Sequence, residues 1–323
     1  MAPLPYDQEQ LVTHHSLASS PRTCHWGFFE ASRAPVLTVA SGDVVTIETL
    51  SGGPDMLPPK DFYVPPELYE VHRHCTDRMV PGHILTGPIA ISGAEPGDVL
   101  EVRIHDVELR QDWGWNVIRP LAGTLPDDFD RVRKLNIPLD RARNLARLPW
   151  GLELPLRPFF GVMGVAPPAA WGRISSLVPR AHGGNLDNKE LVAGTTLYLP
   201  VLVPGALFSC GDGHAAQGDG EVCVTAIETA LKGTFELIVR KDLRFAFPRA
   251  ETATHYVTMG LHPSLDVAVE MALRDMIRLL GELVGLSRED AYTLCSLAAD
   301  LRVTQTVNGN KGIHCVIDKQ LCQ

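Results

Sequence analysis

Gly87-Pro-Ile-Ala-Ile-Ser92 is followed at once by Gly93-Ala-Glu-Pro-Gly-Asp98 and then by Val99-Leu-Glu-Val-Arg-Ile104, a succession that predicts strand, turn and strand. Gly-Asp before an alternating apolar run is typical of a turn that needs positive φ, followed by a half-buried strand. The pattern also occurs over residues 36–49, and a weaker copy occurs over residues 194–203. Three such units predict a mainly β fold whose body is a jelly-roll-like β-sandwich of antiparallel strands.

The segment between residues 110 and 190 is more mixed. Its tryptophans, Trp113, Trp115, Trp150 and Trp171, are spaced among prolines and glycines. We expect long, packed loops here, which could cover either an edge of the core or a binding site.

The last third of the chain changes to a helical pattern. Apolar residues recur at helical spacing after Ser264, which we expect to cap the helix, and Gly285 ends the pattern. Ser287-Arg-Glu-Asp290 predicts a second helix that starts in capping-box style, with Asp in place of Glu. Residues 303–317 predict a hairpin around a glycine-rich turn.

These patterns divide the chain into two parts. Residues 1–225 form a β-sandwich body that carries most of the site residues, and residues 226–323 form a smaller α/β C-terminal part. Strands predicted over residues 222–228 and 234–240 lead from the first part into the second.

Composition limits the classes of partner. The chain has 323 residues and a formal net charge of −9, and no basic run of five or more residues occurs, so we expect no nucleic-acid partner. Residues 1–10 lack the features of a secretory signal, and no apolar run approaches the roughly 18 residues that a transmembrane helix needs. The seven cysteines are scattered without C-x-x-C, as is typical of free thiols in a reducing compartment. We therefore expect a cytoplasmic protein without a membrane partner, and we further expect a homo-oligomer.

Two glycine-rich segments hold most of the residues that could do chemistry. They are His182-Gly-Gly-Asn-Leu-Asp-Asn-Lys189 and Ser209-Cys-Gly-Asp-Gly-His-Ala-Ala-Gln-Gly-Asp-Gly-Glu221. Asp212 and His214 are two residues apart, so on an extended backbone both side chains leave on the same face. Carboxylate and imidazole are common ligands of zinc.

Two further carboxylates can join this pair. Glu221 follows a glycine-rich reversal that can return the chain to the same region, and Asp187 comes from the other segment. Together with Asp212 and His214 they could hold one divalent ion and leave a position open for water, as catalytic sites do.

Each candidate also has an ordinary structural interpretation. Asp in Gly-Asp-Gly forms turns more often than it binds metal, and we interpret Asp219 in that way. Glu221 could be a solvated residue at the start of a strand, and Gln217 could bond the loop backbone instead of a substrate. Histidines elsewhere, such as His25 and His83, could add a ligand, although a surface or hydrogen-bonded core role is commoner for each.

Other catalytic chemistries find less support in the sequence. No Gly-x-Ser-x-Gly elbow occurs, and Ser19-Ser20 lacks the glycine-rich frame of a Ser-Ser-Lys catalytic site. Cys24 and Cys210 are possible nucleophiles, but neither has a sequence context that indicates an activated thiolate.

The glycine-rich segments resemble hallmark segments of the acetamidase/formamidase family. Gly183-Gly-Asn-Leu-Asp-Asn-Lys189 is similar to one of them, and Gly211-Asp-Gly-His-Ala-Ala-Gln-Gly-Asp-Gly-Glu221 is similar to another. Residues 85–98 and 161–165 resemble two more, and the resemblance extends from about residue 23 to residue 318. Residues 23–29 and 51–55 differ from the segments of formamidases proper, which leaves the identity of the amide open.

The resemblance implies hydrolysis of a short linear carboxamide, such as formamide or acetamide, to a carboxylic acid and ammonia. It also implies a β-rich body with an α/β C-terminal part and a bound divalent metal, for which we expect zinc, with calcium as the alternative. Metal binding is assigned on this basis to Asp187, Asp212 and His214, with Glu221 and Gln217 as further site residues.

Metal-assisted hydrolysis is the mechanism that fits these residues, with Glu221 as the carboxylate that takes the proton of water. Two alternatives stay open. The chain could hydrolyse another C–N bond, such as that of a cyclic amide, or it could be a metal-binding β-sandwich protein without catalytic activity.

Overall fold

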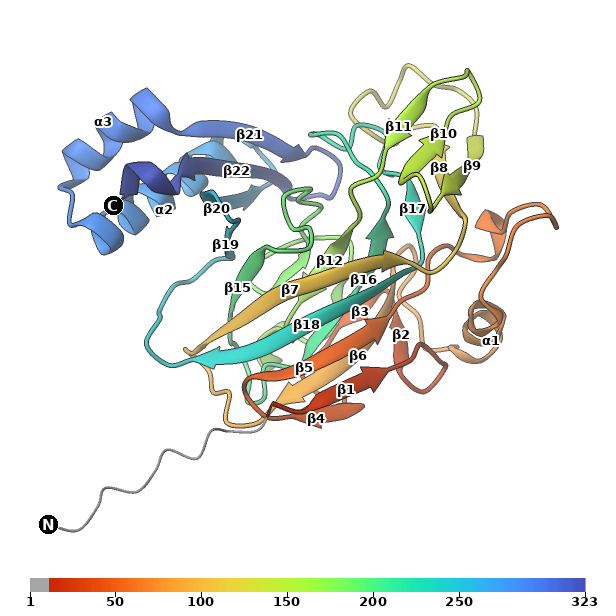
Figure 1. Ribbon diagram of the computed structural model, residues 1–323, viewed down its shortest axis with the longest axis horizontal. Helices are drawn as coiled ribbons and strands as arrows, with labels where there is room; N and C mark the ends of the chain where they lie inside the picture. The colour runs from red at the N-terminus through yellow and green to blue at the C-terminus, as the bar shows by residue number, and fades with distance from the viewer. Residues whose placement is uncertain (1–11, 323) are drawn as a thin grey trace, which may run out of the picture.

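The computed structural model describes residues 12–322 and places two large β-sheets face to face (Figure 1). Residues 1–11 and 323 lie outside the description, and with them the segment on which the expectation of no secretory signal rests. The first sheet contains, in spatial order, β1 (His14–Leu17), β5 (Asp43–Glu48), β18 (Leu231–Arg240), β7 (Val99–Leu109), β15 (Thr196–Pro200), β19 (Arg249–Glu251), β20 (His255–His262), β22 (Lys311–Asp318) and β21 (Asp300–Gln305).

The second sheet contains strands from both glycine-rich segments. Its order is β11 (Glu153–Pro155), β10 (Leu145–Arg147), β9 (Arg133–Asp140), β8 (Trp113–Ile118), β17 (Glu228–Thr229), β16 (Phe208–His214), β12 (Phe159–Gly164) and β14 (Gly183–Asn185). β6 (Ile84–Ile91) also pairs with β16, and it pairs in turn with β2 (Cys24–Trp26) and β4 (Leu37–Val39). A small sheet joins β3 (Phe28–Phe29) to β13 (Ile174–Ser175).

Aromatic side chains fill the space between the two large sheets. Phe235 of β18 lies 5.4 Å from Phe160 of β12 and 6.1 Å from Phe208 of β16, measured between ring centroids. All three side chains are fully buried. Burial of aromatic surface on this scale is a main source of stability in a sandwich, so the two sheets share one core.

The predicted Gly-Asp turns are present. Gly42 and Gly97 have φ of +93° and +96°, a conformation that other residues rarely adopt. The carboxylate of Asp43 accepts the backbone N–H of Ala40 at 2.8 Å, and that of Asp98 accepts the N–H of Glu95 at 3.0 Å. The mainly β prediction is confirmed, and most strand pairs are antiparallel.

One prediction for the middle of the chain holds in part and another is wrong. Residues 110–190 contain long loops, over 119–132 and 176–182, but the first of these loops is mostly exposed instead of packed. β8 to β12 also run through this segment, and β8 to β11 form the upper right of Figure 1. Residues 222–228 do not form a strand, and β17 begins only at Glu228. The chain there is bent by positive φ at Glu221 and Val224, which prevents regular pairing.

The C-terminal part has its own core beneath α2 (Leu265–Val284) and α3 (Arg288–Ala298). Gly260 of β20 lets α2 approach, since an added Cβ would lie 1.9 Å from the carbonyl oxygen of Ala268. Gly285 ends α2 in the left-handed conformation, as predicted. Ser264 occupies the N-cap position, but its side chain makes no capping bond, so that part of the prediction is wrong.

The start of α3 follows its predicted motif with one variation. The Ser287 side chain accepts the backbone N–H of Asp290 at 3.1 Å. The Asp290 carboxylate accepts the Ser287 hydroxyl at 2.7 Å, because Asp is one methylene shorter than the Glu that usually closes such a box. The remaining helical segments are α1 (Pro66–His74) and three short 3₁₀ turns, Pro54–Met56, Ala169–Trp171 and Lys319–Cys322.

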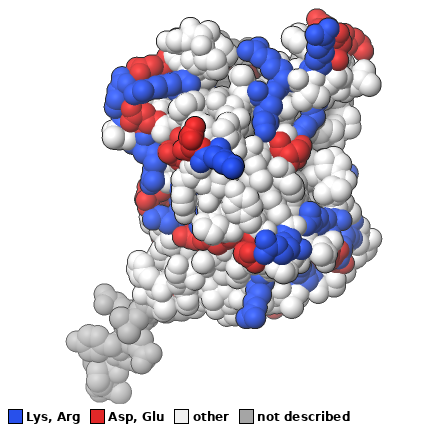
Figure 2. Space-filling view, turned by 90° about the vertical axis from the view of Figure 1, so that its right-hand side faces the viewer, with Lys and Arg blue, Asp and Glu red and all other residues white. Residues whose placement is uncertain are grey.

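The surface and the cysteines add three observations. Figure 2 shows basic and acidic side chains interspersed around a mostly uncharged centre on one face. All seven cysteines lie within residues 12–322, and all are free thiols. In the same described range, no helix has the length and hydropathy that crossing a bilayer requires.

Candidate metal and active site

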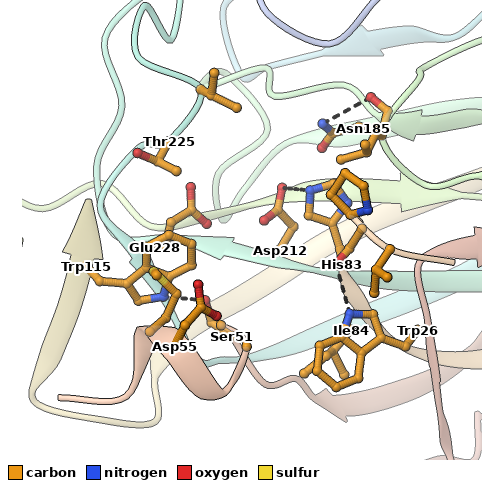
Figure 3. Close-up of a pocket in the computed structure, with 18 of the residues that line it drawn as sticks. Trp26, Ser51, Asp55, His83, Ile84, Trp115, Asn185, Asp212, Thr225 and Glu228 are labelled. Carbon is orange, nitrogen blue, oxygen red and sulfur yellow. Dashed lines mark hydrogen bonds and ion pairs between the residues drawn. The ribbon is translucent and has the colours of Figure 1, made fainter. Parts of the chain in front are cut away.

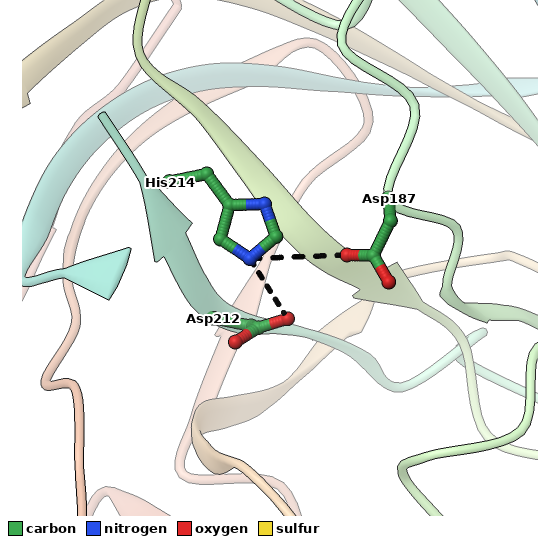
Figure 4. Close-up of side chains that lie close together, drawn as sticks. All are labelled: Asp187, Asp212 and His214. Carbon is green, nitrogen blue, oxygen red and sulfur yellow. Dashed lines mark ion pairs between the residues drawn. The ribbon is translucent and has the colours of Figure 1, made fainter. Parts of the chain in front are cut away.

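Asp187, Asp212 and His214 meet at the end of the second sheet (Figure 4). The Nε2 atom of His214 lies 3.4 Å from Oδ2 of Asp212 and 3.9 Å from Oδ1 of Asp187. Asp212 and His214 belong to β16, and Asp187 follows β14 two residues after its end. Both β16 and β14 pair with β12, so one strand aligns the two glycine-rich segments that the sequence analysis identified.

Gly161 of β12 makes room for these side chains. An added Cβ at this position would lie 2.4 Å from Oδ1 of Asp187 and 2.7 Å from Oδ2 of Asp212. Its carbonyl oxygen also accepts the backbone N–H of Asp187 at 3.1 Å. Glycine is therefore required here because the backbone of β12 forms the floor under the two carboxylates.

Replacing Gly161 with Ala should disrupt the site without unfolding the protein. The added methyl group must push the two carboxylates apart, and overpacking of this kind costs about 1–3 kcal/mol of stability. We expect the affinity for a divalent ion, measured by calorimetry, to fall by at least about tenfold, as it does when the groups that orient metal ligands are disturbed. Gly281→Ala in α2 is the control, since an added Cβ there meets no atom closer than 3.5 Å. Equal affinities in the two variants would contradict this account of Gly161.

Gln217 determines which nitrogen of His214 is free. The Nε2 amide of Gln217 donates to the backbone carbonyl of Asp187 at 2.7 Å, so its Oε1 atom faces Nδ1 of His214 at 2.9 Å. A carbonyl oxygen can only accept, so Nδ1 of His214 must carry a hydrogen. Its Nε2 atom is then the one directed at the carboxylates, and a metal-binding histidine is commonly oriented by such a bond at its other nitrogen.

Two glutamates complete the cluster. Oε1 of Glu228 lies 3.2 Å from Nε2 of His214, and Glu228 stands opposite His214 in the pairing of β17 with β16. Glu221 is 5% exposed, and the hydrogen bond from the Thr306 N–H to the Gly220 carbonyl, 3.0 Å long, holds its loop against the C-terminal hairpin. His214, Glu221 and Glu228 form a second group of donors within 4.8 Å of one another.

Asn308 adds a contribution from the C-terminal part. Its side-chain Nδ2 donates to Oδ2 of Asp187 and, at 3.3 Å, to the carbonyl oxygen of Asn185. The residue lies in the glycine-rich turn between β21 and β22 and is 7% exposed. The site is therefore assembled from both parts of the chain.

The cluster has an excess of buried negative charge. Among the described residues, no Lys or Arg forms an ion pair with Asp187, Asp212, Glu221 or Glu228. Burial raises the pKa of Glu221 well above its usual value, and the charge of Asp187 adds to the effect. Burial likewise raises the pKa of Glu228 to about 8. Carboxylates that share a dry site resist ionising together, so a bound cation would favour the ionised form of these groups.

The neighbouring carboxylates also change the pKa of His214. Burial alone would lower the pKa of His214, but Glu228 and Asp212 raise it well above its usual value. The charges of His83 and His214 outweigh burial at Asp212 and lower the pKa of its carboxyl group. Nε2 of His214 is thus a position where a positive charge is stabilised.

The residues present fit a divalent cation. Nε2 of His214, Oδ1 of Asp187 and Oε2 of Glu221 are buried and have no hydrogen-bond partner in the described part of the chain. Buried polar atoms nearly always have a hydrogen-bond partner in native proteins. Unpaired nitrogen and oxygen atoms that converge in this way therefore indicate that a ligand binds between them. One nitrogen and several carboxylate oxygens form a donor set that suits zinc better than calcium, which is bound through oxygen ligands.

A cavity of about 410 Å³ opens onto one side of the cluster (Figure 3). Asp212, Glu221, Glu228 and Asn308 line its inner end. His83 also lines it, with Nε2 at 3.6 Å from Oδ2 of Asp212 and Nδ1 at 3.0 Å from the hydroxyl of Ser176. A small molecule in this cavity can therefore reach the carboxylates directly.

The structure brings together all five residues identified from the sequence, Asp187, Asp212, His214, Gln217 and Glu221. The interpretation of Glu221 as a solvated strand residue is wrong, because it is buried in a bent loop. Of the other histidines considered, His83 reaches the site, whereas His25 lies in the core beside Phe28 and Phe29.

The sequence analysis missed Glu228 and Asn308. Glu228 had a detectable signal, since it is the one acidic residue in the otherwise uncharged run Thr225-Ala-Ile-Glu-Thr-Ala-Leu231. A charged residue inside such a run is either paired or functional when it is buried. Asn308 had no such signal, because Asn before Gly is ordinary turn chemistry.

Comparison with known proteins places these features in a family context. The family model described as "Acetamidase/Formamidase family" matches residues 34–174 and 169–317. Two curated relatives are a formamidase of Methylophilus methylotrophus, 32% identical over 46% of this chain and 49% of its own, and an acetamidase of Mycolicibacterium smegmatis, 27% identical over 45% and 50%. The matched region thus spans about half the length of these relatives.

A solved structure matches over nearly its full length. The crystal structure of an acetamidase from Bacillus halodurans is similar with a TM-score of 0.82 and 32% identity, and the match covers 95% of this chain and 98% of that one.

Proposed function

Because the chain belongs to the acetamidase/formamidase family, we propose that it hydrolyses the C–N bond of a small linear carboxamide to give a carboxylic acid and ammonia. The observation that carries this proposal is the buried cluster of one histidine and four carboxylates, three of which line an accessible cavity. Amides are poor electrophiles with a poor leaving group, so their hydrolysis needs both an activated water and a polarised carbonyl. The cluster supplies the groups for both tasks.

We propose that Asp187, Asp212 and His214 hold a divalent cation, zinc in preference to calcium. When bound, such an ion lowers the pKa of water and polarises a carbonyl group. The two unpaired buried atoms at Nε2 of His214 and Oδ1 of Asp187 support this assignment. Gln217 contributes by holding the His214 ring with Nε2 toward the carboxylates.

Glu221 is the proposed proton acceptor. Its Oε2 atom has no hydrogen-bond partner, whereas Oε1 of Glu228 already accepts the backbone N–H of Ala226 at 3.0 Å. A raised pKa brings the titration of the Glu221 carboxyl group closer to neutral pH, which suits a group that must first accept and later return a proton. Glu228 then serves to orient His214, and its charge contributes to the raised pKa of Glu221.

The wider setting of the enzyme is proposed on the same basis. We propose that it works in the cytoplasm as a homo-oligomer, with small amides as its partners. The boundary near residue 225 remains a prediction, and the proposed site draws on both sides of it, since Glu228 and Asn308 follow the boundary. Light scattering of the purified protein measures the oligomeric state directly.

Ammonia release tests the proposed function. The purified protein is incubated with a panel that runs from formamide and acetamide to cyclic amides, and ammonia and carboxylic acid are both quantified. Equimolar acid and ammonia from a linear amide support the proposal. If only a cyclic amide is hydrolysed, the substrate is a cyclic amide instead of a linear one. If no amide is turned over, the chain is a metal-binding protein without this activity.

A further inference from the structure

The cavity beside the carboxylates is larger than a two-carbon amide requires. Its volume of about 410 Å³ lies in the range of roughly 300–1,000 Å³ that is typical of pockets for drug-sized ligands. Acetamide has four non-hydrogen atoms, so it would occupy only the inner end. The rest of the cavity would hold water against whatever side chains line it.

Much of that lining is apolar and aromatic. Trp26, Leu50, Met56 and Trp115 line the cavity. Figure 3 shows Trp115 and Trp26 on opposite sides, with Glu228 and Asp212 between them. A wall of this kind favours an apolar ligand, because water that contacts it gains few hydrogen bonds.

The indole N–H groups of Trp26 and Trp115 already donate hydrogen bonds within the protein. Nε1 of Trp26 donates to the carbonyl oxygen of Gly82 at 2.9 Å, and Nε1 of Trp115 donates to the hydroxyl of Ser51 at 3.2 Å. These bonds fix the two side chains. The ring of Trp26 is covered by the guanidinium of Arg78 and by His72, so Trp115 offers the more open carbon surface to a ligand. The wall is therefore formed before any substrate arrives.

The two arginines that line the cavity also interact with other groups of the protein. Arg78 donates to the carbonyl oxygens of Cys75 and His72, and its guanidinium lies 4.3 Å from the ring centroid of Trp26. Arg119 lies 3.4 Å from the carboxylate of Asp55. With paired arginines at the rim and an excess of carboxylates inside, the cavity disfavours a substrate that carries a negative charge.

We infer that the preferred substrate is a neutral primary amide whose acyl side carries an apolar group of the size of an aromatic ring, as in arylacetamides. This inference rests on the proposed function, since release of ammonia leaves the acyl side as the only place for such a group. The amide lies at the carboxylates, and the ring packs against Trp115.

The ratio of kcat/KM for phenylacetamide to that for acetamide tests the inference. Burying one methylene is worth about a factor of four in affinity, so a buried ring should raise the ratio to at least about ten. A ratio of one or less, with acetamide turned over, would overturn the inference and leave the proposed function in place. No ammonia from either amide would overturn both.

Two matched variants locate the effect. Trp115→Leu should lower the ratio at least about tenfold, because it removes part of the wall against which the ring packs. Trp171→Leu is the control, since Trp171 is 44% exposed and does not line this cavity. Met56→Ala is a second test variant should Trp115→Leu fail to fold. If the test variants change the ratio no more than the control does, the ring does not bind here.

Discussion

Asp212→Asn and His214→Ala should each yield a folded protein that releases ammonia from an amide at least a thousandfold more slowly than the native chain. Asp212→Asn replaces the carboxylate whose Oδ2 lies 3.4 Å from Nε2 of His214, and His214→Ala removes that nitrogen itself. A bound ion contributes several kcal/mol to the stabilisation of transition-state charge, which corresponds to a rate factor on the order of a thousand or more. Turnover number, metal content and circular dichroism of each variant are the measurements.

Asp219→Asn is the matched control for Asp212→Asn. Asp219 also stands between two glycines, but its carboxylate pairs with Nζ of Lys189 at 3.0 Å, with side chains that are 34% and 26% exposed. Loss of a partly exposed ion pair costs only about 0–1 kcal/mol of stability. We expect this control to keep its rate, so full activity in Asp212→Asn, or an equal loss in both variants, would contradict the assignment.

Glu221→Gln should lower the turnover number on the order of a hundredfold or more while the protein still binds metal. The change keeps the size of the side chain and most of its hydrogen bonds, but an amide cannot accept the proton of water. Asp187, Asp212 and His214 remain to hold the ion. Metal content and turnover number measured on the same preparation separate the possible roles.

Three outcomes are distinguishable for Glu221. A large loss of rate with metal retained identifies the proton acceptor, whereas loss of metal and partial rescue by excess ion identify a ligand. An unchanged rate removes Glu221 from the reaction. Glu228→Gln is the informative comparison, because Glu228 contacts His214 at 3.2 Å and accepts the Ala226 N–H, so it should affect metal affinity more than proton transfer.

Local signals in the sequence predicted the turns and helix ends well. Gly42, Gly97 and Gly285 adopt positive φ where the sequence requires it, because glycine alone takes this conformation without strain. Ser287 caps α3 for a similarly local reason. These features depend on neighbours in the chain, which a single sequence displays.

Features that depend on distant contacts could not be predicted in this way. β9 is an exception that the sequence analysis missed, since Leu135, Ile137 and Leu139 alternate with polar residues or proline, which is a local sign of a strand. The bend at Glu221 and Val224 arises because that loop is tied to the C-terminal hairpin through Gly220. The sequence contains no short-range sign of this tie.

The site was predictable where its residues are close in sequence. Asp212 and His214 lie on one strand, and the glycine-rich reversal does return Glu221 to them. Glu228 joins by pairing of β17 with β16, and Asn308 joins from a turn more than a hundred residues after Asp187. Only the folded sheet brings these last two residues to the cluster.

Titration of a divalent ion into the chelated protein, followed by ammonia release, tests the central claim most directly. The protein is first stripped with a chelator until elemental analysis finds no bound metal, and zinc or calcium is then added in steps. We predict that the stripped protein is inactive and that its rate rises with added ion and saturates near stoichiometry. Full activity in protein that has been verified to contain no metal would contradict the account.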